Sequence, residues 1–205
     1  NGHHYFISSL QAKDVEGWIT LGRTAETAAL FNPMNGECGE AKVRKHQGKT
    51  QVYLQLKSGE SIILQTYKQP LKDSKPWRYK KEQPISLQLE HGWKLHFAQS
   101  EPAIEDTFCI DRTIPWNTIP HQATTVNMGT GIYTVEVDLP EIPADDWVLD
   151  LGDVRESARV HINGQDVGCA WAVPFRLSVG QYLKPGKNTI AIAVTNLPAN
   201  RISEM

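Results

Sequence analysis

Apolar and polar residues alternate along this chain in short stretches, most clearly in its last third. Ala158, Val160 and Ile162 are apolar, whereas Arg159 and His161 between them are polar. A period of two is typical of a β-strand that has one face in a core and the other toward solvent. The pattern therefore predicts that Val160 and Ile162 are buried and that Arg159 and His161 are exposed.

Turn residues separate this strand from the alternating stretches around it. Asn163-Gly164 follows the strand directly, and both residue types tolerate the positive φ that a tight hairpin turn requires. A second turn signal at 184–188 precedes Ile190 and Ile192, which again occupy alternate positions. Strands are also predicted at 5–9, 18–21, 52–56, 61–67, 85–89, 93–97, 132–139 and 147–151. Many short strands with turn residues between them predict an all-β fold of the sandwich class.

A polar stretch in the first half of the chain predicts a boundary between two domains. Residues 69–83 are rich in proline and lysine and contain few apolar groups, which is typical of a connector. We therefore expect a small β-sandwich over 1–68, a linker over 69–83 and a second, larger β-sandwich over 84–205.

Charge and composition exclude several classes of partner. The chain of 205 residues has 21 basic and 23 acidic residues, a formal net charge of -2 and no block of like charge, so nucleic acid is not an expected partner. No apolar run approaches the roughly 18 residues of a membrane helix, so no membrane partner is expected. Cys38, Cys109 and Cys169 lie far apart without a CxxC pattern. We expect at most one disulfide, no metal site and no cofactor.

The C-terminal part of the chain resembles a known family. The segments that carry this resemblance are LDLGDV at 149–154, RVHINGQDVG at 159–168, PFRL at 174–177 and VTNLPANR at 194–201. The order strand, Asn-Gly hairpin, aromatic-Pro-Phe segment, Pro-Gly turn and strand resembles the galactose-binding-like jelly roll of family 2 glycoside hydrolases. The residues of these segments resemble even more closely the C-terminal region of family 106 rhamnosidase-like proteins. The resemblance implies that 84–205 is a galactose-binding-like jelly roll.

This resemblance implies carbohydrate processing without a catalytic centre in these residues. The catalytic carboxylates of the related enzymes belong to a separate barrel domain, and that domain of the same protein would be a partner. We therefore expect a noncatalytic accessory region of a glycoside hydrolase, part of a longer chain that is periplasmic or secreted. An independent carbohydrate-binding or protein-interaction module is the alternative. Galactose-binding-like sandwiches often hold a structural calcium ion. This sequence has acidic loop residues but no calcium-loop motif, so a structural calcium ion is a possible but not a required ligand.

Residues for a sugar contact are sought in the loops at one end of the second sandwich, because its faces are used for packing or for solvation. Sugar recognition normally combines an aromatic face with a few fixed polar groups. Trp116, Arg155, Glu156 and Trp171 form the predicted carbohydrate-binding set, for a ligand such as a plant-type oligosaccharide. A competing interpretation places Trp171, together with Phe175, as a plug at the open end of the core.

Carboxylates are dense between residues 145 and 156, but their density alone does not make a catalytic pair. A glycosidase places two carboxylates about 5–5.5 Å apart when it retains configuration and about 6.5–9.5 Å apart when it inverts. Asp145 and Asp146 follow a proline and are typical of a solvated turn, and Asp150 is expected to face solvent or to cap a turn. We therefore predict no catalytic residue in this chain.

Overall fold

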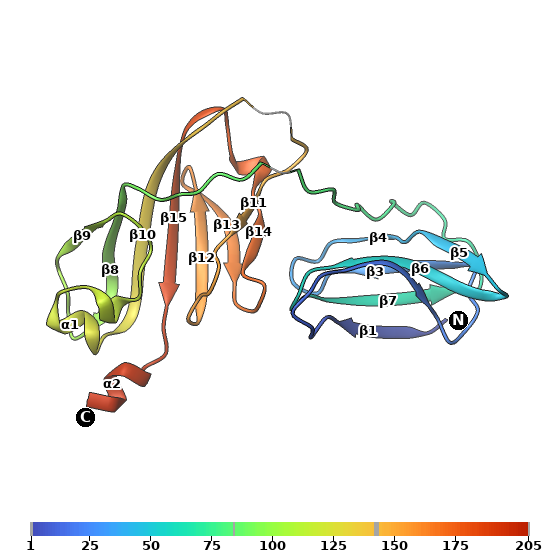
Figure 1. Ribbon diagram of the computed structural model, residues 1–205, viewed down its shortest axis with the longest axis horizontal. Helices are drawn as coiled ribbons and strands as arrows, with labels where there is room; N and C mark the ends of the chain where they lie inside the picture. The colour runs from blue at the N-terminus through green and yellow to red at the C-terminus, as the bar shows by residue number, and fades with distance from the viewer. Residues whose placement is uncertain (1, 84, 142–143, 205) are drawn as a thin grey trace. The chain divides into compact units, whose positions relative to one another are not determined.

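The computed structural model describes residues 2–83, 85–141 and 144–204, and strands make up most of their regular structure (Figure 1). The predicted all-β sandwich class is confirmed. The chain divides into two compact units, residues 1–84 and 85–205. Each unit has its own hydrophobic core, so each is described by itself.

The first unit is a small sandwich of two antiparallel sheets. One sheet has the order β1-β7-β3-β4, with β1 at His4–Ser8, β7 at Ser61–Tyr67, β3 at Thr27–Phe31 and β4 at Cys38–Glu40. The other has the order β2-β6-β5, with β2 at Val15–Thr20, β6 at Lys49–Leu56 and β5 at Val43–His46. Leu30 and Leu64 from one sheet and Val52 and Leu54 from the other are at most 2% exposed. The alternating pattern of β6 therefore buries one side of that strand between the sheets.

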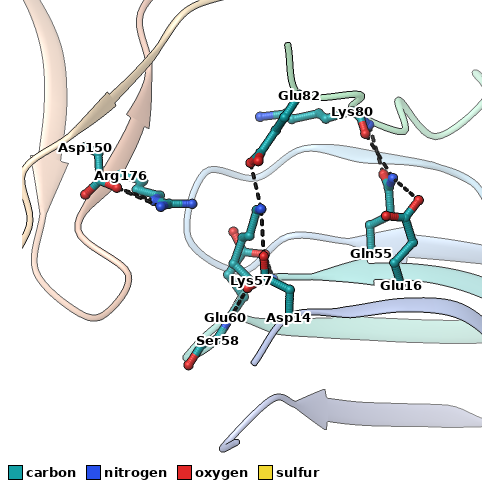
Figure 2. A network of polar contacts seen from close by, with 10 residues as sticks. All are labelled: Asp14, Glu16, Gln55, Lys57, Ser58, Glu60, Lys80, Glu82, Asp150 and Arg176. Atoms are coloured by element: carbon teal, nitrogen blue, oxygen red, sulfur yellow. Dashed lines mark hydrogen bonds and ion pairs between the residues drawn. The ribbon is translucent and has the colours of Figure 1, made fainter. Parts of the chain in front are cut away.

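Residues 69–83 pack along the first unit, whereas the sequence predicts a solvated linker there. The Trp77 side chain packs against the core, and its backbone N–H donates to the Glu40 carbonyl at 2.8 Å. The Tyr79 hydroxyl donates to the Tyr53 carbonyl at 3.0 Å. Figure 2 shows Lys57 between two carboxylates, with Nζ 2.8 Å from Asp14 and 2.7 Å from Glu82. Two aromatic side chains thus attach a segment whose composition is otherwise typical of a linker.

The second unit is built on one six-stranded antiparallel sheet of order β13-β12-β15-β10-β8-β9. Its strands are β13 at Gln165–Ala170, β12 at Ser157–Ile162, β15 at Gly186–Thr195, β10 at Met128–Leu139, β8 at Trp93–Glu101 and β9 at Thr107–Ile110. The other elements are the strand pair β11 at Val148–Asp150 and β14 at Arg176–Ser178, the 3-10 helices at Trp116–Thr118 and Gly180–Tyr182, and the helices α1 at Gln122–Thr125 and α2 at Ala199–Glu204. Side chains from the large sheet, including Leu95, Val135 and Val160, share one core with Phe175 and Val179.

The register of β12 agrees with the alternation of its residues. Val160 and Ile162 are fully buried, and the Arg159 side chain is 60% exposed, as predicted. His161 lies between the two classes, because its side chain is 40% exposed and its Nε2 is 3.8 Å from Asp166 Oδ1. Asn163 begins the predicted turn with a φ of 52°, which is the left-handed conformation that asparagine tolerates.

Residues 85–89 do not form the strand that the sequence predicts. Both edges of β8 are already paired, one with β10 and the other with β9, so no neighbouring edge of that strand is open to them. Leu89 instead packs against the core, and its carbonyl accepts a 2.7 Å hydrogen bond from Trp93 Nε1. The apolar pattern of this stretch therefore reflects packing of a single side chain.

The three cysteines are exposed and unpaired. Cys38 lies in β4 of the first unit. Cys109 and Cys169 lie in β9 and β13, the two edge strands of the six-stranded sheet, and therefore do not meet.

Candidate functional site

Three of the four predicted sugar-contact residues come together at one end of the second unit. Ala158 of β12 pairs with Ala170 of β13, so the residues before Ser157 and after Ala170 emerge at the same end of this strand pair. Arg155, Glu156 and Trp171 occupy those positions, and the Asn163-Gly164 turn closes the opposite end. The hairpin thus brings a cation, a carboxylate and an aromatic ring to one end of the sheet.

Hydrogen bonds fix the polar side of this site. Arg155 Nε and Nη2 donate to the two carboxylate oxygens of Asp153 at 2.9 and 2.8 Å. This bidentate hydrogen bond raises the pKa of Arg155 and lowers the pKa of the Asp153 carboxyl. The Glu156 N–H donates to the Thr195 carbonyl at 2.8 Å, so its backbone extends the β12–β15 pairing while its side chain stays exposed. The Arg155 guanidinium is therefore oriented by a contact within the unit, and the Glu156 backbone by another.

Trp171 presents its ring to solvent, so the competing interpretation as a core plug is wrong for this residue. It is 60% exposed, and its neighbour Val173 is 62% exposed. Phe175 is 7% exposed and is the aromatic residue that enters the core. The Trp171 ring is consequently accessible to a ligand that stacks on an indole.

Trp116 does not belong to this site, which corrects the prediction. It is only 8% exposed, and its ring centroid lies 4.9 Å from that of Phe97 in the core. A Cβ atom added at Gly131 would lie 2.9 Å from Trp116 Cζ2. Because this glycine of β10 has no side chain, the indole can pack directly against the strand. β10 and β13 are three strand spacings apart in the sheet, which is roughly 15 Å.

A depression of about 390 Å³ lies at the same end of the six-stranded sheet, between β8, β10 and the segment that follows β15. Its lining includes Ser100, Glu101, Gly129 and Asn196. Asn196 Oδ1 accepts from the Gly129 N–H at 2.9 Å, and Asn196 Nδ2 donates to the Asn127 carbonyl at 2.9 Å. The side-chain amide of Asn196 therefore holds the wall of this depression.

Two further acids of the second unit, Asp150 and Asp146, have structural partners. Asp150 accepts hydrogen bonds from Arg176 Nε at 2.8 Å (Figure 2) and from the Gly152 N–H at 3.0 Å, and the second bond agrees with the predicted turn cap. Asp146 Oδ1 accepts from the Gly180 N–H at 2.9 Å and so joins two loops. These carboxylates therefore stabilise local backbone conformations.

A second cluster of candidate side chains lies in the first unit and was missed from the sequence. Trp18 of β2 stands opposite Tyr53 of β6 in the register, and their ring centroids are 5.3 Å apart in an edge-to-face arrangement. Tyr79 lies 5.3 Å from Tyr53 on the other side. The signal was available in β6, where Tyr53 alternates with the buried Val52 and Leu54 and must therefore face away from the core.

Among residues 2–83, 85–141 and 144–204, no group of three or more His, Cys, Asp or Glu side chains is placed to hold a metal ion. None of the helices in these ranges is long and apolar enough to cross a membrane. The structural calcium ion stays a prediction.

The chain is similar to known proteins, although no family model matches it. A protein of Formosa agariphila named "Putative beta-glucuronidase" is 31% identical over 125 residues, which is 60% of this chain and 11% of that protein. The rhamnosidase from Novosphingobium sp. PP1Y superposes with a TM-score of 0.81 and 25% identity, over 98% of this chain and 19% of the rhamnosidase.

These comparisons define the class of protein to which the fold corresponds. Both relatives are named as glycoside hydrolases, and this chain spans only 11% and 19% of their lengths. The resemblance to the C-terminal region of a rhamnosidase-like glycoside hydrolase, predicted from the sequence, is confirmed. The likeness extends over both units, because it covers 98% of the chain.

Proposed function

We propose that this chain is a noncatalytic accessory region of a rhamnosidase-like glycoside hydrolase and that its second unit contacts carbohydrate. The observation that carries the proposal is the superposition on the rhamnosidase over 98% of this chain and only 19% of the enzyme. The catalytic barrel would then lie in the same protein outside these residues, and the whole protein would be secreted or periplasmic. A rhamnose-containing plant-type oligosaccharide is the ligand that this likeness suggests.

The sugar contact is proposed for Trp171, Arg155 and Glu156. An exposed indole can stack on the C–H face of a sugar ring, while the guanidinium donates to hydroxyl groups and the carboxylate accepts from them. The site lies on the surface and surrounds little of a ligand, so binding should be weak, roughly in the millimolar range, for an isolated sugar. An independent carbohydrate-binding module is the second interpretation.

Two measurements test this proposal. The purified chain is assayed for turnover of aryl rhamnosides, galactosides and glucuronides, and none is expected. Turnover that disappears in Glu156→Gln would show that this chain is catalytic. Amide NMR shifts are then recorded during titration with rhamnose and with pectin-derived oligosaccharides, and shifts are expected around Trp171.

Matched variants make the titration specific. Arg155→Gln should remove the shifts around Trp171, whereas Arg112→Gln should not, because Arg112 is an exposed arginine that follows β9 at the far edge of the sheet. Shifts confined to the Asn163-Gly164 turn would contradict the proposed location. A chain that shows neither shifts nor turnover would have a purely structural role.

A further inference from the structure

The outer face of the β2-β6-β5 sheet in the first unit carries an aromatic surface. Trp18, Tyr53 and Tyr79 are half-buried, and none of them belongs to the core cluster of the unit. Their rings follow one another edge to face, with 5.3 Å between the centroids at each step. The three rings, from two strands and the attached segment 69–83, form a continuous row that we call the aromatic row.

Fixed polar groups flank the aromatic row. Glu16 Oε1 accepts hydrogen bonds from the Tyr53 hydroxyl at 2.7 Å and from Gln55 Nε2 at 2.9 Å. The Lys80 N–H donates to Gln55 Oε1 at 2.9 Å, so this amide is oriented from both sides (Figure 2). Gln51 Nε2 donates to Thr20 Oγ1 at 2.9 Å. Aromatic faces beside a few oriented carboxylate and amide groups are the combination that recognises sugar rings and their hydroxyls.

Positive charge borders the same face. Lys42 Nζ lies 4.9 Å from the Tyr79 ring centroid, and the Arg44 guanidinium lies 4.3 Å from that of Trp18. In the part of the chain that the structure describes, the hydrogen bond of Arg44 is from Nε to Gln51 Oε1 at 2.7 Å. The guanidinium therefore has further N–H donors for an acidic group.

We propose that the aromatic row and its basic border bind an acidic oligosaccharide, one that carries uronate carboxylates or sulfate groups. The sugar rings stack on Trp18 and the tyrosines, Arg44 and Lys42 bind the acidic groups, and Glu16 accepts from hydroxyls. Glu16 offers an acceptor to sugar hydroxyls. The formal net charge of -2 disfavours nucleic acid, which needs a concentrated basic surface. This site is separate in sequence and in chemistry from the one proposed around Trp171.

Isothermal titration calorimetry on the full chain tests the proposal with four probes. These are oligogalacturonate, a sulfated galactan oligosaccharide, a neutral galactan oligosaccharide and a single-stranded oligothymidylate. One or both acidic sugars should bind, more weakly as salt is raised, and the neutral sugar should bind at least tenfold more weakly. Comparison of the affinities for oligogalacturonate and for the sulfated galactan shows whether the site prefers carboxylate or sulfate groups.

Matched variants locate the site. Trp18→Ala and Arg44→Gln should each weaken binding of the acidic sugar roughly fivefold to tenfold, and Trp18→Phe should recover part of the loss. Phe6→Ala and Lys68→Gln are the controls, because Phe6 is 71% exposed in β1 and Lys68 is exposed directly after β7, both on the other sheet of this unit. Neither control should change the affinity. Trp171→Ala should also leave it unchanged, which separates this proposal from the preceding one.

Several outcomes would overturn the proposal. Tighter binding of oligothymidylate than of either acidic sugar would indicate a nucleic-acid surface. Equal binding of neutral and acidic sugars would remove the role of Arg44 and Lys42. Absence of binding by all four probes, or equal losses in the test and control variants, would leave the aromatic row with a packing role alone.

Discussion

Asn188 offers a sharp test of the polar packing in the second unit. It is 2% exposed, and all four hydrogen-bonding positions of its amide are used. Oδ1 accepts from Asn163 Nδ2 at 2.9 Å and from the Lys184 N–H at 3.0 Å. Nδ2 donates to the Lys184 carbonyl at 2.7 Å and to the Gly186 carbonyl at 2.8 Å. Asn188→Asp keeps the shape of the side chain but replaces Nδ2 by an oxygen, which cannot donate to the Lys184 and Gly186 carbonyls.

The cost of this substitution follows from the two lost donors and the buried charge. Each lost hydrogen bond costs roughly 0.5–1.5 kcal/mol. Burial beside two carbonyls raises the pKa of the introduced carboxyl, and a rise of about two units costs about 2.7 kcal/mol when the group is ionised. We therefore expect a loss of about 5 kcal/mol in the free energy of unfolding at pH 7.

This destabilisation depends on pH with a definite sign. A carboxyl whose pKa is higher in the folded state than its unfolded value of about 3.9 favours folding only while it is protonated. The extra cost should therefore be absent below about pH 4, increase as the pH rises toward the folded pKa, and then stay constant. Below pH 4, only about 1–3 kcal/mol from the lost donors should be left.

Hydrogen exchange of the intact chain, read by mass spectrometry from peptides that cover β15, measures this loss in the second unit. Asn200→Asp is the matched control, because Asn200 is an exposed asparagine in α2. The control should change the exchange of β15 by less than about 0.5 kcal/mol. A destabilisation that is the same at pH 4 and pH 7, or no larger than that of the control, would refute the role assigned to the Asn188 network.

Three further outcomes are expected. Ile162→Ala should cost roughly 2–5 kcal/mol because Ile162 is fully buried, whereas His161→Ala should cost about 0.5 kcal/mol or less. Equal losses, measured by hydrogen exchange of β12, would contradict the register of this strand. Gly129→Ala should destabilise the second unit strongly, because the added Cβ would lie 2.0 Å from the Gln99 carbonyl oxygen at a φ of 149°, and an unchanged melting temperature would refute this. Trp171→Ala should change unfolding by no more than about 0.5 kcal/mol, since the ring is 60% exposed, and a larger loss would show that Trp171 packs in the fold.

The alternation of apolar and polar residues correctly predicted the features that depend on residues close together in the sequence. The burial of Val160 and Ile162 and the turn at Asn163 follow from a period of two and from a residue that tolerates positive φ. The convergence of Arg155, Glu156 and Trp171 also followed, because an antiparallel hairpin returns to its starting end. For these features the residues that determine the structure lie within one strand or one hairpin.

Features that depend on distant contacts were not predictable in this way. Trp116 lies in an irregular stretch, and nothing near it in sequence tells that Gly131 opens a place for its ring in the core. The pairing of Trp18 with Tyr53 depends on the register of β2 on β6, two strands that are widely separated along the chain. The segment 69–83 has the composition of a linker, and its attachment depends on where Trp77 and Tyr79 find partners.

The placement of the cysteines provides native labelling sites for measuring distances by spectroscopy. Cys109 and Cys169 lie on the two edges of the six-stranded sheet, five strand spacings or roughly 24 Å apart, and can calibrate a pair of spin labels or fluorophores within one rigid unit. Cys38 supplies a third label in the other unit. Replacing one thiol at a time by serine would then give the distance between the two units without adding any cysteine, before and after an oligosaccharide binds.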